Sequence, residues 1–515
     1  MAKKTISQLS VLTLLVVFLA ACSKKAEYVN VIPADATAVA SIDLKSLVNK
    51  AGMNDKENET AKQKLIEALK SGTSAATFQQ LEKVMNNPAT SGLDLEAPFY
   101  IFSSPQTESG AFVAKVSSKD DLRASLDVMA KEQICEPVNS ADGYDFTTLN
   151  GMLLAYNETT AIILPIDGTS DTETAKETVN KLMKQGADKS ITKSGAFQKM
   201  EKQKNDINFF ASMSAIPAAY RSQISIGLPT DIQLEDISVV GGLSFDNGKI
   251  ALKTENYTEN EAVKSLLKKQ KDSFEATNGK FVKYFPASTL MFLNVGVKGE
   301  GLYNLLSENK EFSNTVSIAK SDEVKEIFSS FDGDISVGLI NVTMNSAPTF
   351  LAYADIKNGK ALEALYKNKQ ALGLNRGEDI LELSQNEYVF KTRGMNIFFG
   401  VKDKQMYATN DELLYKSVGK EVDKSISEAP YAAEMKNKTF FMAINTEAIL
   451  DLPVVKMLVG FGGQEFKTYT DLASKVSYIT ADSEGESSET ALCLKDKDAN
   501  ALKQIVNFAK QFAGM

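Results

Sequence analysis

The feature that most constrains the fold of this chain is a similarity between its two halves. Five short segments of the first half recur in the same order in the second half, at offsets between 231 and 253 residues. The aligned positions are Pro33 with Pro286, Phe112 with Phe350, Gly151 with Gly394, Phe209 with Phe440, and Ala251 with Ala491. Five matches in one order predict a tandem duplication. We therefore expect two repeats, residues 30–275 and 280–515, with a boundary in the polar stretch 271–280.

Each half combines the patterns of strands and helices. The alternation of Ala40, Ile42 and Leu44 predicts a half-buried strand. Apolar residues at helical spacing in 61–69 predict an amphipathic helix. The segment from Ser170 to Glu173 has the pattern of a capping box and predicts that a helix follows it.

Turn signals between apolar segments indicate how the strands pair. Asp246-Asn247-Gly248 has the composition of a tight hairpin turn. Strands that are joined by short turns run antiparallel, and amphipathic helices need a sheet face on which to bury their apolar side. We therefore predict an α+β fold, a tandem duplication of a strand/helix unit with mainly antiparallel sheets and helices packed on one face.

The amino terminus has the pattern of an export signal. Lys3 and Lys4 precede a short apolar run, residues 11–19, which is too short to span a bilayer as a helix. The following Leu19-Ala20-Ala21-Cys22 resembles the lipobox of bacterial lipoproteins. The resemblance implies that residues 1–21 are a signal peptide, that Cys22 is lipidated, and that residues 22–29 form a lipidated tether. A cleaved secretory signal with an incidental cysteine and an uncleaved helical anchor are the alternatives.

The predicted tether is short. A fully extended chain spans at most about 3.6 Å per residue, so the few residues after Cys22 reach roughly 20 Å. The folded body is therefore expected to lie close to the membrane surface.

The composition excludes several classes of function. The 515 residues contain no histidine, which excludes Ser-His-Asp and Cys-His catalysis and histidine-ligated metals. The net charge is −9, and only four arginines are present, which argues against nucleic acid as a partner. Carboxylate-only mechanisms, Ser-Lys pairs and oxygen-ligated calcium survive. We predict no catalytic residue, no metal site and no cofactor.

Several local motifs have both a functional and a structural interpretation. The acidic stretch 482–489 and Asp332-Gly333-Asp334 could offer calcium ligands, but neither has the spacing of a calcium loop. A solvated hairpin loop is favoured for the first, and a helix cap or a turn into a strand for the second. Ser118-Lys119 and Lys193-Ser194 are neighbours in sequence, which does not place their side chains together.

Aromatic doublets and two further cysteines also have alternative interpretations. The doublets begin at Phe209, Phe398 and Phe440, and they could line an apolar cavity or fill the core. Cys135 and Cys493 lie far apart in sequence, and we favour buried free thiols over a disulfide.

Most of the chain after Cys22 resembles a lipoprotein family of the Bacteroidota that is known only as a domain of unknown function. The resemblance includes the segment 28–37, YVNVIPADAT, and Asp43-Leu-Lys-Ser-Leu. It implies an envelope location and supplies no catalytic motif. In that group Ser23 after the lipidated cysteine implies the outer membrane, and the absence of an acidic cluster in 23–27 implies the periplasmic face rather than the cell surface.

These observations predict an envelope-anchored, non-enzymatic binding or structural protein on the periplasmic face of the outer membrane. Its expected partners are the membrane, through the lipid, and an envelope protein or an apolar ligand. The first alternative is a carboxylate-based hydrolase of glycans, which needs two acids about 5–10 Å apart in a cleft. The second is an outer-membrane assembly factor, which needs an exposed apolar groove.

Overall fold

The structure is a computed structural model that describes residues 27–56, 59–72, 74–141, 143–166, 172–216, 233–307, 322–344, 346–367, 369, 374 and 377–513. The predicted signal peptide, the lipidation site Cys22 and the predicted cap Ser170 lie outside the described residues. The chain forms two compact units. Unit 1 comprises Met1–Ala215, Ser238–Ser244 and Leu502–Met515, and unit 2 comprises Ile216–Ile237 and Phe245–Ala501.

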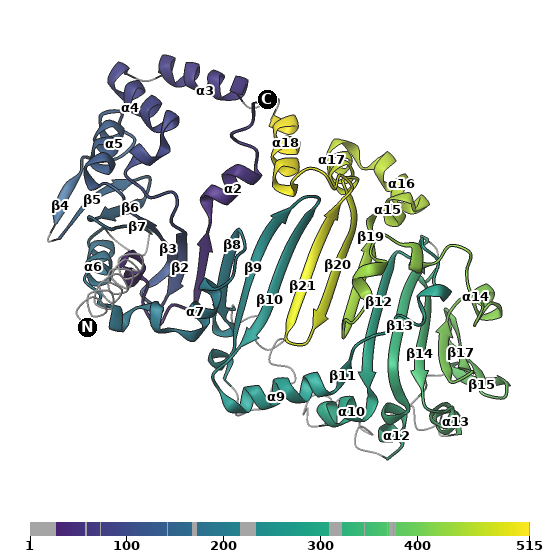
Figure 1. The fold of residues 1–515 in the computed structure, drawn as a ribbon. Helices are drawn as coiled ribbons and strands as arrows, with labels where there is room; N and C mark the ends of the chain where they lie inside the picture. Colours follow the sequence, from purple (N-terminus) through teal and green to yellow (C-terminus); the bar gives the residue numbers. More distant parts are fainter. Residues whose placement is uncertain are drawn as a thin grey trace, which may run out of the picture. The chain divides into compact units, whose positions relative to one another are not determined.

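Unit 1 contains an antiparallel sheet in the strand order β9-β8-β1-β2-β3-β7-β6-β5-β4 (Figure 1). The central strand β1 pairs on one side with β2 and on the other with β8. The bounds are β1 Ala38–Ile42, β2 Phe99–Ser104, β3 Thr107–Lys115, β4 Asn139–Ala141, β5 Tyr144–Leu149, β6 Met152–Tyr156, β7 Thr160–Pro165, β8 Ile207–Ser212 and β9 Ser238–Asp246.

Unit 2 contains an antiparallel sheet in the order β10-β21-β20-β19-β12-β13-β14-β18-β17-β16-β15, and β11 pairs with β12 beyond the end of β19. The bounds are β10 Lys249–Tyr257, β11 Phe274–Glu275, β12 Met291–Lys298, β13 Phe331–Asn341, β14 Thr349–Ile356, β15 Asp379–Ser384, β16 Glu387–Lys391, β17 Asn396–Lys402, β18 Gln405–Thr409, β19 Phe440–Asn445, β20 Val476–Glu484 and β21 Ser487–Leu494.

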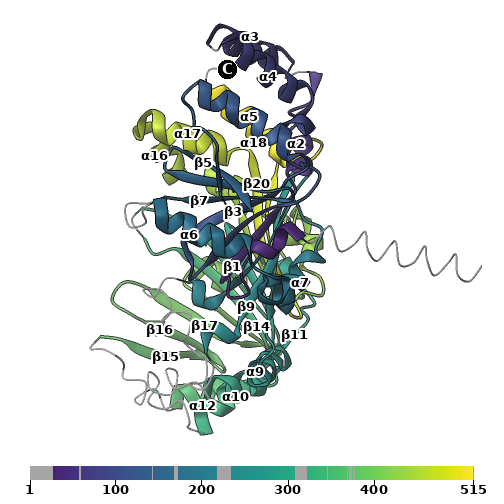
Figure 2. The same cartoon turned by 90° about the vertical axis from the view of Figure 1, so that its left-hand side faces the viewer.

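Helices connect the strands of both units. In unit 1, α6 packs on β6 and β7. Figure 2 shows α6 beside β7. Its helices are α2 Leu44–Lys50, α3 Glu59–Gly72, α4 Ala75–Asn86, α5 Lys119–Lys131, α6 Thr172–Met183, α7 Gly195–Glu201 and α18 Ala501–Ala513. The helices of unit 2 are α9 Glu261–Asp272, α10 Gly299–Ser307, α12 Asp322–Ser330, α13 Lys360–Lys367, α14 Glu412–Lys416, α15 Thr446–Asp451, α16 Pro453–Phe461 and α17 Gly463–Ala473.

Short 3-10 helices complete the connections. They are η1 Glu27–Val31, η3 Pro88–Ser91, η4 Ala187–Lys189, η5 Ile191–Lys193, η6 Met213–Ala215, η7 Leu234–Asp236, η8 Val282–Tyr284, η10 Ile426–Glu428 and η11 Ala432–Met435. Tyr28 and Val29 in η1 are buried, so the folded body starts within the range that we assigned to the tether.

The mixed fold class is confirmed, because each unit combines helices with an antiparallel sheet. The turn at Asn247 and Gly248 between β9 and β10 is also confirmed, and Gly248 has a φ of +63° that favours glycine. The predicted helices near 61–69 and after Ser170 are α3 and α6. Among the described residues, no helix combines the length and apolar character that crossing a bilayer requires.

The prediction for 40–44 is wrong in two details. β1 ends at Ile42, and Leu44 is the first residue of α2, whose N-cap Asp43 accepts a hydrogen bond from the backbone N–H of Ser46 at 2.8 Å. The most buried side chains of β1 are Val39 and Ser41 rather than those of the predicted face. A strand with small residues on both faces does not reveal from its sequence which face the core covers.

The core of unit 2 is rich in aromatic rings. Phe285 packs edge-on against Phe292 at a centroid distance of 5.1 Å, and Phe281 stacks on Tyr353 at 5.4 Å. In unit 1, Leu122 of α5 belongs to a cluster that includes strand residues of β2, β3, β6 and β7. Buried aromatic side chains contribute a large share of the stabilising apolar area.

Candidate functional site

A hollow in unit 2 has a floor that is built by four neighbouring strands. Val295 of β12 pairs with Phe440 of β19, and Phe440 pairs with Ser483 of β20. Ser483 in turn lies opposite Ser488 of β21. Residues that are directly paired across antiparallel strands place their side chains on the same face, so these four side chains form one row across the sheet. Asn256 of β10, two residues beyond the register partner of Ser488, also lines the pocket.

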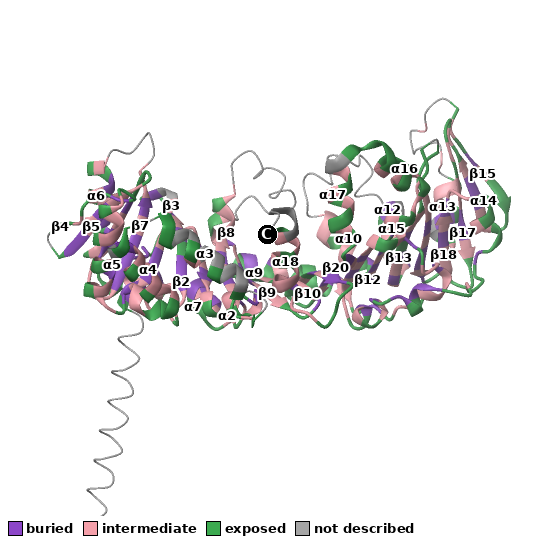
Figure 3. Ribbon diagram, turned by 90° about the horizontal axis from the view of Figure 1, so that it is seen from above, coloured by how far each residue is buried: buried purple, intermediate pink, exposed green. Residues whose placement is uncertain are grey.

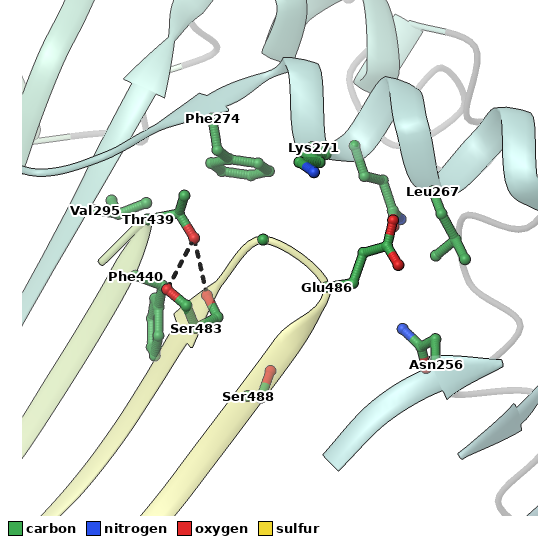
Figure 4. A pocket seen from close by; sticks show the side chains of 12 residues that line it. Asn256, Leu267, Lys271, Phe274, Val295, Thr439, Phe440, Ser483, Glu486 and Ser488 are labelled. Atoms are coloured by element: carbon green, nitrogen blue, oxygen red, sulfur yellow. Dashed lines mark hydrogen bonds between the residues drawn. The ribbon is translucent and has the colours of Figure 1, made fainter. Parts of the chain in front are cut away.

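Helix α9 and strand β11 supply the opposite wall. Asn260 caps α9 by accepting a hydrogen bond from the backbone N–H of Ala262 at 2.9 Å. Val263 and Leu266 of α9 are buried. Leu267, Gln270 and Lys271 of the same helix line the pocket. Phe274 follows directly in β11 and also contributes to the lining. Figure 4 shows Leu267, Lys271 and Phe274 around the hollow.

The pocket has a lining that combines apolar and polar side chains. Its volume is about 250 Å³. The apolar lining consists of Leu267, Phe274, Val295 and Phe440, and the charged groups are Lys271 and Glu486. The Thr439 hydroxyl donates a hydrogen bond to the Ser483 carbonyl oxygen at 3.0 Å, which joins β19 and β20 at the rim (Figure 4). Ligand sites for whole small molecules are typically larger, roughly 300–1,000 Å³, so this hollow suits part of a ligand.

The acidic stretch 482–489 is the β20–β21 hairpin, and lysines neutralise its carboxylates. Lys438 forms ion pairs with Asp482 at 3.0 Å and Glu484 at 3.2 Å. Lys249 forms an ion pair with Glu489 at 2.5 Å. Burial disfavours the charged form of Glu489, but the hydrogen bonds and positive charges of Lys249 and Lys253 together outweigh it and lower the pKa of Glu489. The described residues include no group of three or more possible metal ligands from His, Cys, Asp and Glu.

The second acidic motif, Asp332-Gly333-Asp334, begins strand β13 rather than capping a helix. Gly333 has a φ of +124°, in a part of β13 where the strand register is irregular. The Asp334 carboxylate is buried and accepts hydrogen bonds from the backbone N–H groups of Asn278 at 3.0 Å, Gly279 at 2.8 Å and Lys280 at 3.2 Å. Its role is therefore to hold the 278–280 loop against β13.

The two Ser-Lys neighbours are parts of helix starts. The Ser118 hydroxyl accepts a hydrogen bond from the Asp121 N–H at 3.2 Å and caps α5. The Ser194 hydroxyl accepts one from the Phe197 N–H at 3.4 Å and caps α7. Lys119 forms an ion pair with Asp145 at 3.3 Å. These contacts account for both serines structurally.

The aromatic doublets divide between core and pocket. Phe210, Phe399 and Phe441 are buried in the core. Phe440, the neighbour of Phe441, lines the pocket, because adjacent strand residues point to opposite faces of the sheet. Phe398 stacks on Tyr415 at a centroid distance of 4.8 Å. Both interpretations of the doublets therefore hold, one for each member of the pair at 440–441.

The interpretation of the cysteines as buried free thiols is confirmed. Cys135 and Cys493 are both buried and unpaired. The Cys135 thiol donates a weak hydrogen bond to the Leu126 carbonyl oxygen at 3.5 Å. Burial raises the pKa of Cys493, which makes its thiol less reactive.

Sequence reasoning missed the pocket and a buried carboxyl in unit 1. The pocket residues come from five separate stretches of chain. Two of these stretches, the doublet at Phe440 and the acidic stretch 482–489, stood out in the sequence, but no pattern placed them together. The Tyr100 hydroxyl lies 3.1 Å from both carboxyl oxygens of Glu201. Burial raises the pKa of Glu201. The two residues are 101 positions apart, and no motif signalled their contact.

The fold and the hollow define an antiparallel α+β protein with a partly apolar pocket on the strands of unit 2. Residues 28–502 match the family described as "Domain of unknown function (DUF4836)". The chain therefore belongs to the DUF4836 family.

Among solved structures, two crystal forms of TP0453 are similar to this chain. Form IV has a TM-score of 0.24 at 8% identity and covers 44% of this chain and 79% of that chain. Form III has a TM-score of 0.25 at 8% identity, and the match covers 49% of this chain and 89% of that chain. Similarity at this level supports no inference about fold or function. A comparison with curated proteins finds no match.

Proposed function

We propose that this protein is a membrane-anchored binding protein without enzymatic activity, which takes the apolar end of an amphipathic ligand into the pocket under α9. The observation that carries the proposal is the arrangement of Phe274, Val295 and Phe440 around one hollow. An apolar group gains free energy by leaving water for such a surface, at roughly 25 cal/mol per Å². Lys271 and the rim hydroxyls can bind the polar end of the same ligand.

The pocket chemistry favours binding over glycan hydrolysis. Glycosidases need two carboxyl groups on either side of the scissile bond. Glu486 is the single acid among the residues that line the pocket, and it is exposed. Glu201, whose pKa is raised, belongs to unit 1 and its carboxyl faces Tyr100. A carboxylate-based hydrolase therefore has less support as the alternative.

The fold of the two repeats is part of the proposal. The strands of unit 1 lie in the order β8-β1-β2-β3-β7-β6-β5-β4, and those of unit 2 lie in the order β19-β12-β13-β14-β18-β17-β16-β15. Each strand of the first series corresponds to the strand at the same place in the second, because both series follow one another along the chain in the same way. Tandem duplication of a strand/helix unit, with helices on one face, accounts for this agreement.

A pair of matching contacts outside the strands gives further support for duplication. The Ile191 N–H donates to the Ile32 carbonyl oxygen at 2.9 Å, and the Ile426 N–H donates to the Phe285 carbonyl oxygen at 2.9 Å. The isolated bridges Pro33–Ser190 and Pro286–Ser425 lie beside these bonds. Pro33 and Pro286 are the pair that the sequence alignment matched. A shared ancestor of the two repeats explains why such irregular contacts recur.

The anchor is the second part of the proposed function. Lipid on Cys22, attached after removal of residues 1–21, holds the body at the periplasmic face of the outer membrane of a member of the Bacteroidota. A single acyl chain binds membranes only marginally, whereas two or more chains anchor stably. Cells that express the wild type should incorporate labelled palmitate into the protein and retain it in the outer-membrane fraction. A Cys22→Ala variant that fractionates and labels like the wild type would refute the anchor.

The pocket is tested with a fluorescent amphipathic probe. 1-Anilinonaphthalene-8-sulfonate should bind the purified chain and lose affinity at least roughly tenfold in Phe440→Asp, because a charge replaces the apolar floor. Leu413→Asp changes an exposed apolar residue of α14 elsewhere in unit 2 and is the matched control. Equal probe binding by Phe440→Asp and the wild type would remove the pocket from the proposal.

A further inference from the structure

The side chains on the floor of the pocket under α9 change from apolar to polar along one direction of the sheet. The row of register partners starts with Val295 of β12 and Phe440 of β19, and it continues with Ser483 of β20 and Ser488 of β21. Figure 4 shows Val295 and Phe440 on one side of the hollow and Asn256 of β10 on the other. Neighbouring strands lie about 4.8 Å apart, so the three steps from β12 to β21 span roughly 14 Å. A ligand that lies along the row therefore meets apolar groups at one end and polar groups at the other.

The polar part of the lining carries neutral groups that both donate and accept hydrogen bonds. Asn256 and Gln270 have carboxamides, and Ser488 has a hydroxyl. Within the described residues, the structure gives these three side chains no hydrogen-bond partner, whereas the Thr439 and Ser483 hydroxyls bind each other at 3.1 Å. The carboxamides and the Ser488 hydroxyl are therefore available to a ligand, whose polar atoms can take the place of water.

The charges around the pocket do not select an ionic headgroup. Lys271 and Glu486 are the charged residues of the lining, both are exposed, and their charges cancel. Helix α9 ends at Asp272, and its carbonyl end carries a partial negative charge that Lys269 and Lys271 of the last turn offset. The lining therefore presents no excess of either charge. An ionic headgroup would lose hydration there without gaining a dedicated counter-ion.

We propose that the pocket binds a neutral amphiphile whose polar end carries several hydroxyl groups, the chemistry of an alkyl or aryl glycoside. The apolar aglycone lies against Val295 and Phe440, and the hydroxyls bind Asn256 and Ser488. A sugar ring holds several donor–acceptor groups on one rigid frame, so it can bind side chains of different strands at a small cost in conformational entropy. This inference rests on the proposed function of the pocket and adds the class of headgroup.

The test compares four headgroups on the same hexyl chain. Hexyl β-D-glucoside, N-hexylacetamide, hexyl phosphate and hexyltrimethylammonium each compete with 1-anilinonaphthalene-8-sulfonate for the purified chain. The aromatic rings of the probe occupy the apolar end, so the probe reports displacement by any headgroup. The glucoside should have an inhibition constant at least roughly fivefold lower than the other three compounds, because its headgroup adds hydrogen bonds to the neutral groups of the lining.

Helix α16 offers the probe a second apolar surface, which the measurement must exclude. Phe461 is 86% exposed, and Figure 3 shows α16 largely in the colour of exposed residues. The inhibition constants are therefore taken from the part of the probe fluorescence that Phe440→Asp abolishes. That part reports the pocket and not the surface of α16.

Substitutions at the polar end separate the headgroup from the rest of the pocket. Ser488→Ala and Asn256→Ala should each raise the inhibition constant of the glucoside at least roughly threefold and leave the affinity for the probe unchanged. Ser487→Ala is the matched control, because Ser487 is exposed, adjoins Ser488 in β21 and points to the opposite face of the sheet. It should change none of the inhibition constants.

The possible failures are distinguishable. Any of the other three compounds binding as tightly as the glucoside would overturn the proposed headgroup and leave the apolar pocket in place. A glucoside constant that is unchanged in both Ser488→Ala and Asn256→Ala would also overturn it, because the hydroxyls would then bind elsewhere. Probe fluorescence that Phe440→Asp does not reduce would refute the pocket itself and, with it, the proposed function.

Discussion

Substitutions of the neighbouring residues Phe440 and Phe441 should affect different properties, ligand binding for Phe440 and the free energy of unfolding for Phe441. Phe441 is completely buried in the aromatic core of unit 2, whereas Phe440 is partly exposed and lines the pocket. Replacing a buried phenylalanine by alanine removes its transfer free energy and leaves a cavity, which together cost about 3–5 kcal/mol. Phe440 has a hollow beside it already, so only part of its transfer free energy is lost, roughly 1 kcal/mol.

The assay is urea unfolding followed by far-ultraviolet circular dichroism, together with probe binding by each variant. Phe441→Ala should shift the unfolding midpoint strongly and leave the affinity for 1-anilinonaphthalene-8-sulfonate nearly unchanged under native conditions. Phe440→Ala should shift the midpoint little and weaken binding at least several-fold. Equal loss of stability in the two variants would refute the reasoning, because it would mean that Phe440 is packed as tightly as Phe441.

Three further predictions concern structural features of the two units. Asp334→Ala leaves the backbone N–H groups of Asn278 and Gly279 without their acceptor, while the Lys280 N–H keeps the Asn278 side chain as an acceptor, and the change should lower the free energy of unfolding by about 2–4 kcal/mol. Asp332→Ala, which removes a half-exposed carboxylate, should cost less than about 0.5 kcal/mol in the same urea titration. The lowered pKa of Glu489 means that its ionised form stabilises the fold above the pKa of the unfolded chain, and this contribution is lost as the pH falls through the lower folded-state pKa. Glu489→Gln should therefore flatten the acid side of a plot of stability against pH, and an unchanged acid limb would contradict the assignment. Gly92→Ala should destabilise unit 1 by more than about 1 kcal/mol, because φ is +87° and an added Cβ would lie 2.3 Å from the Leu122 nitrogen, whereas Gly72→Ala meets no atom within 4 Å and should not lower the melting temperature.

Local patterns predicted local structure well. The glycine of Asp246-Asn247-Gly248 adopts a positive φ in the turn between β9 and β10, and the apolar spacing of 61–69 lies in α3. These features depend on a few adjacent residues, because turn conformation and helical amphipathicity are properties of short segments. The same patterns did not indicate which face of β1 is buried, since burial depends on the layer that packs against it.

The motifs with possible chemistry were also decided by distant partners. Asp334 and the acids of 482–489 could equally have faced a cation or solvent. In the structure, backbone N–H groups of residues 278–280 bind Asp334, and Lys438 and Lys249 bind the hairpin acids. These partners are 44 or more residues away along the chain, beyond the reach of any spacing rule.

By itself, the sequence determined the mixed class of the fold, its principal turns and helices, and the exclusion of histidine-based chemistry. Those results follow from residue types and short-range periodicity, which do not depend on the path of the chain. Only the tertiary structure decided that Phe440 faces a hollow while Phe441 fills the core, and that Met457, Leu458 and Phe461 remain uncovered. Both depend on strand register and on which elements pack together, because burial is a property of the neighbours of a residue rather than of the residue.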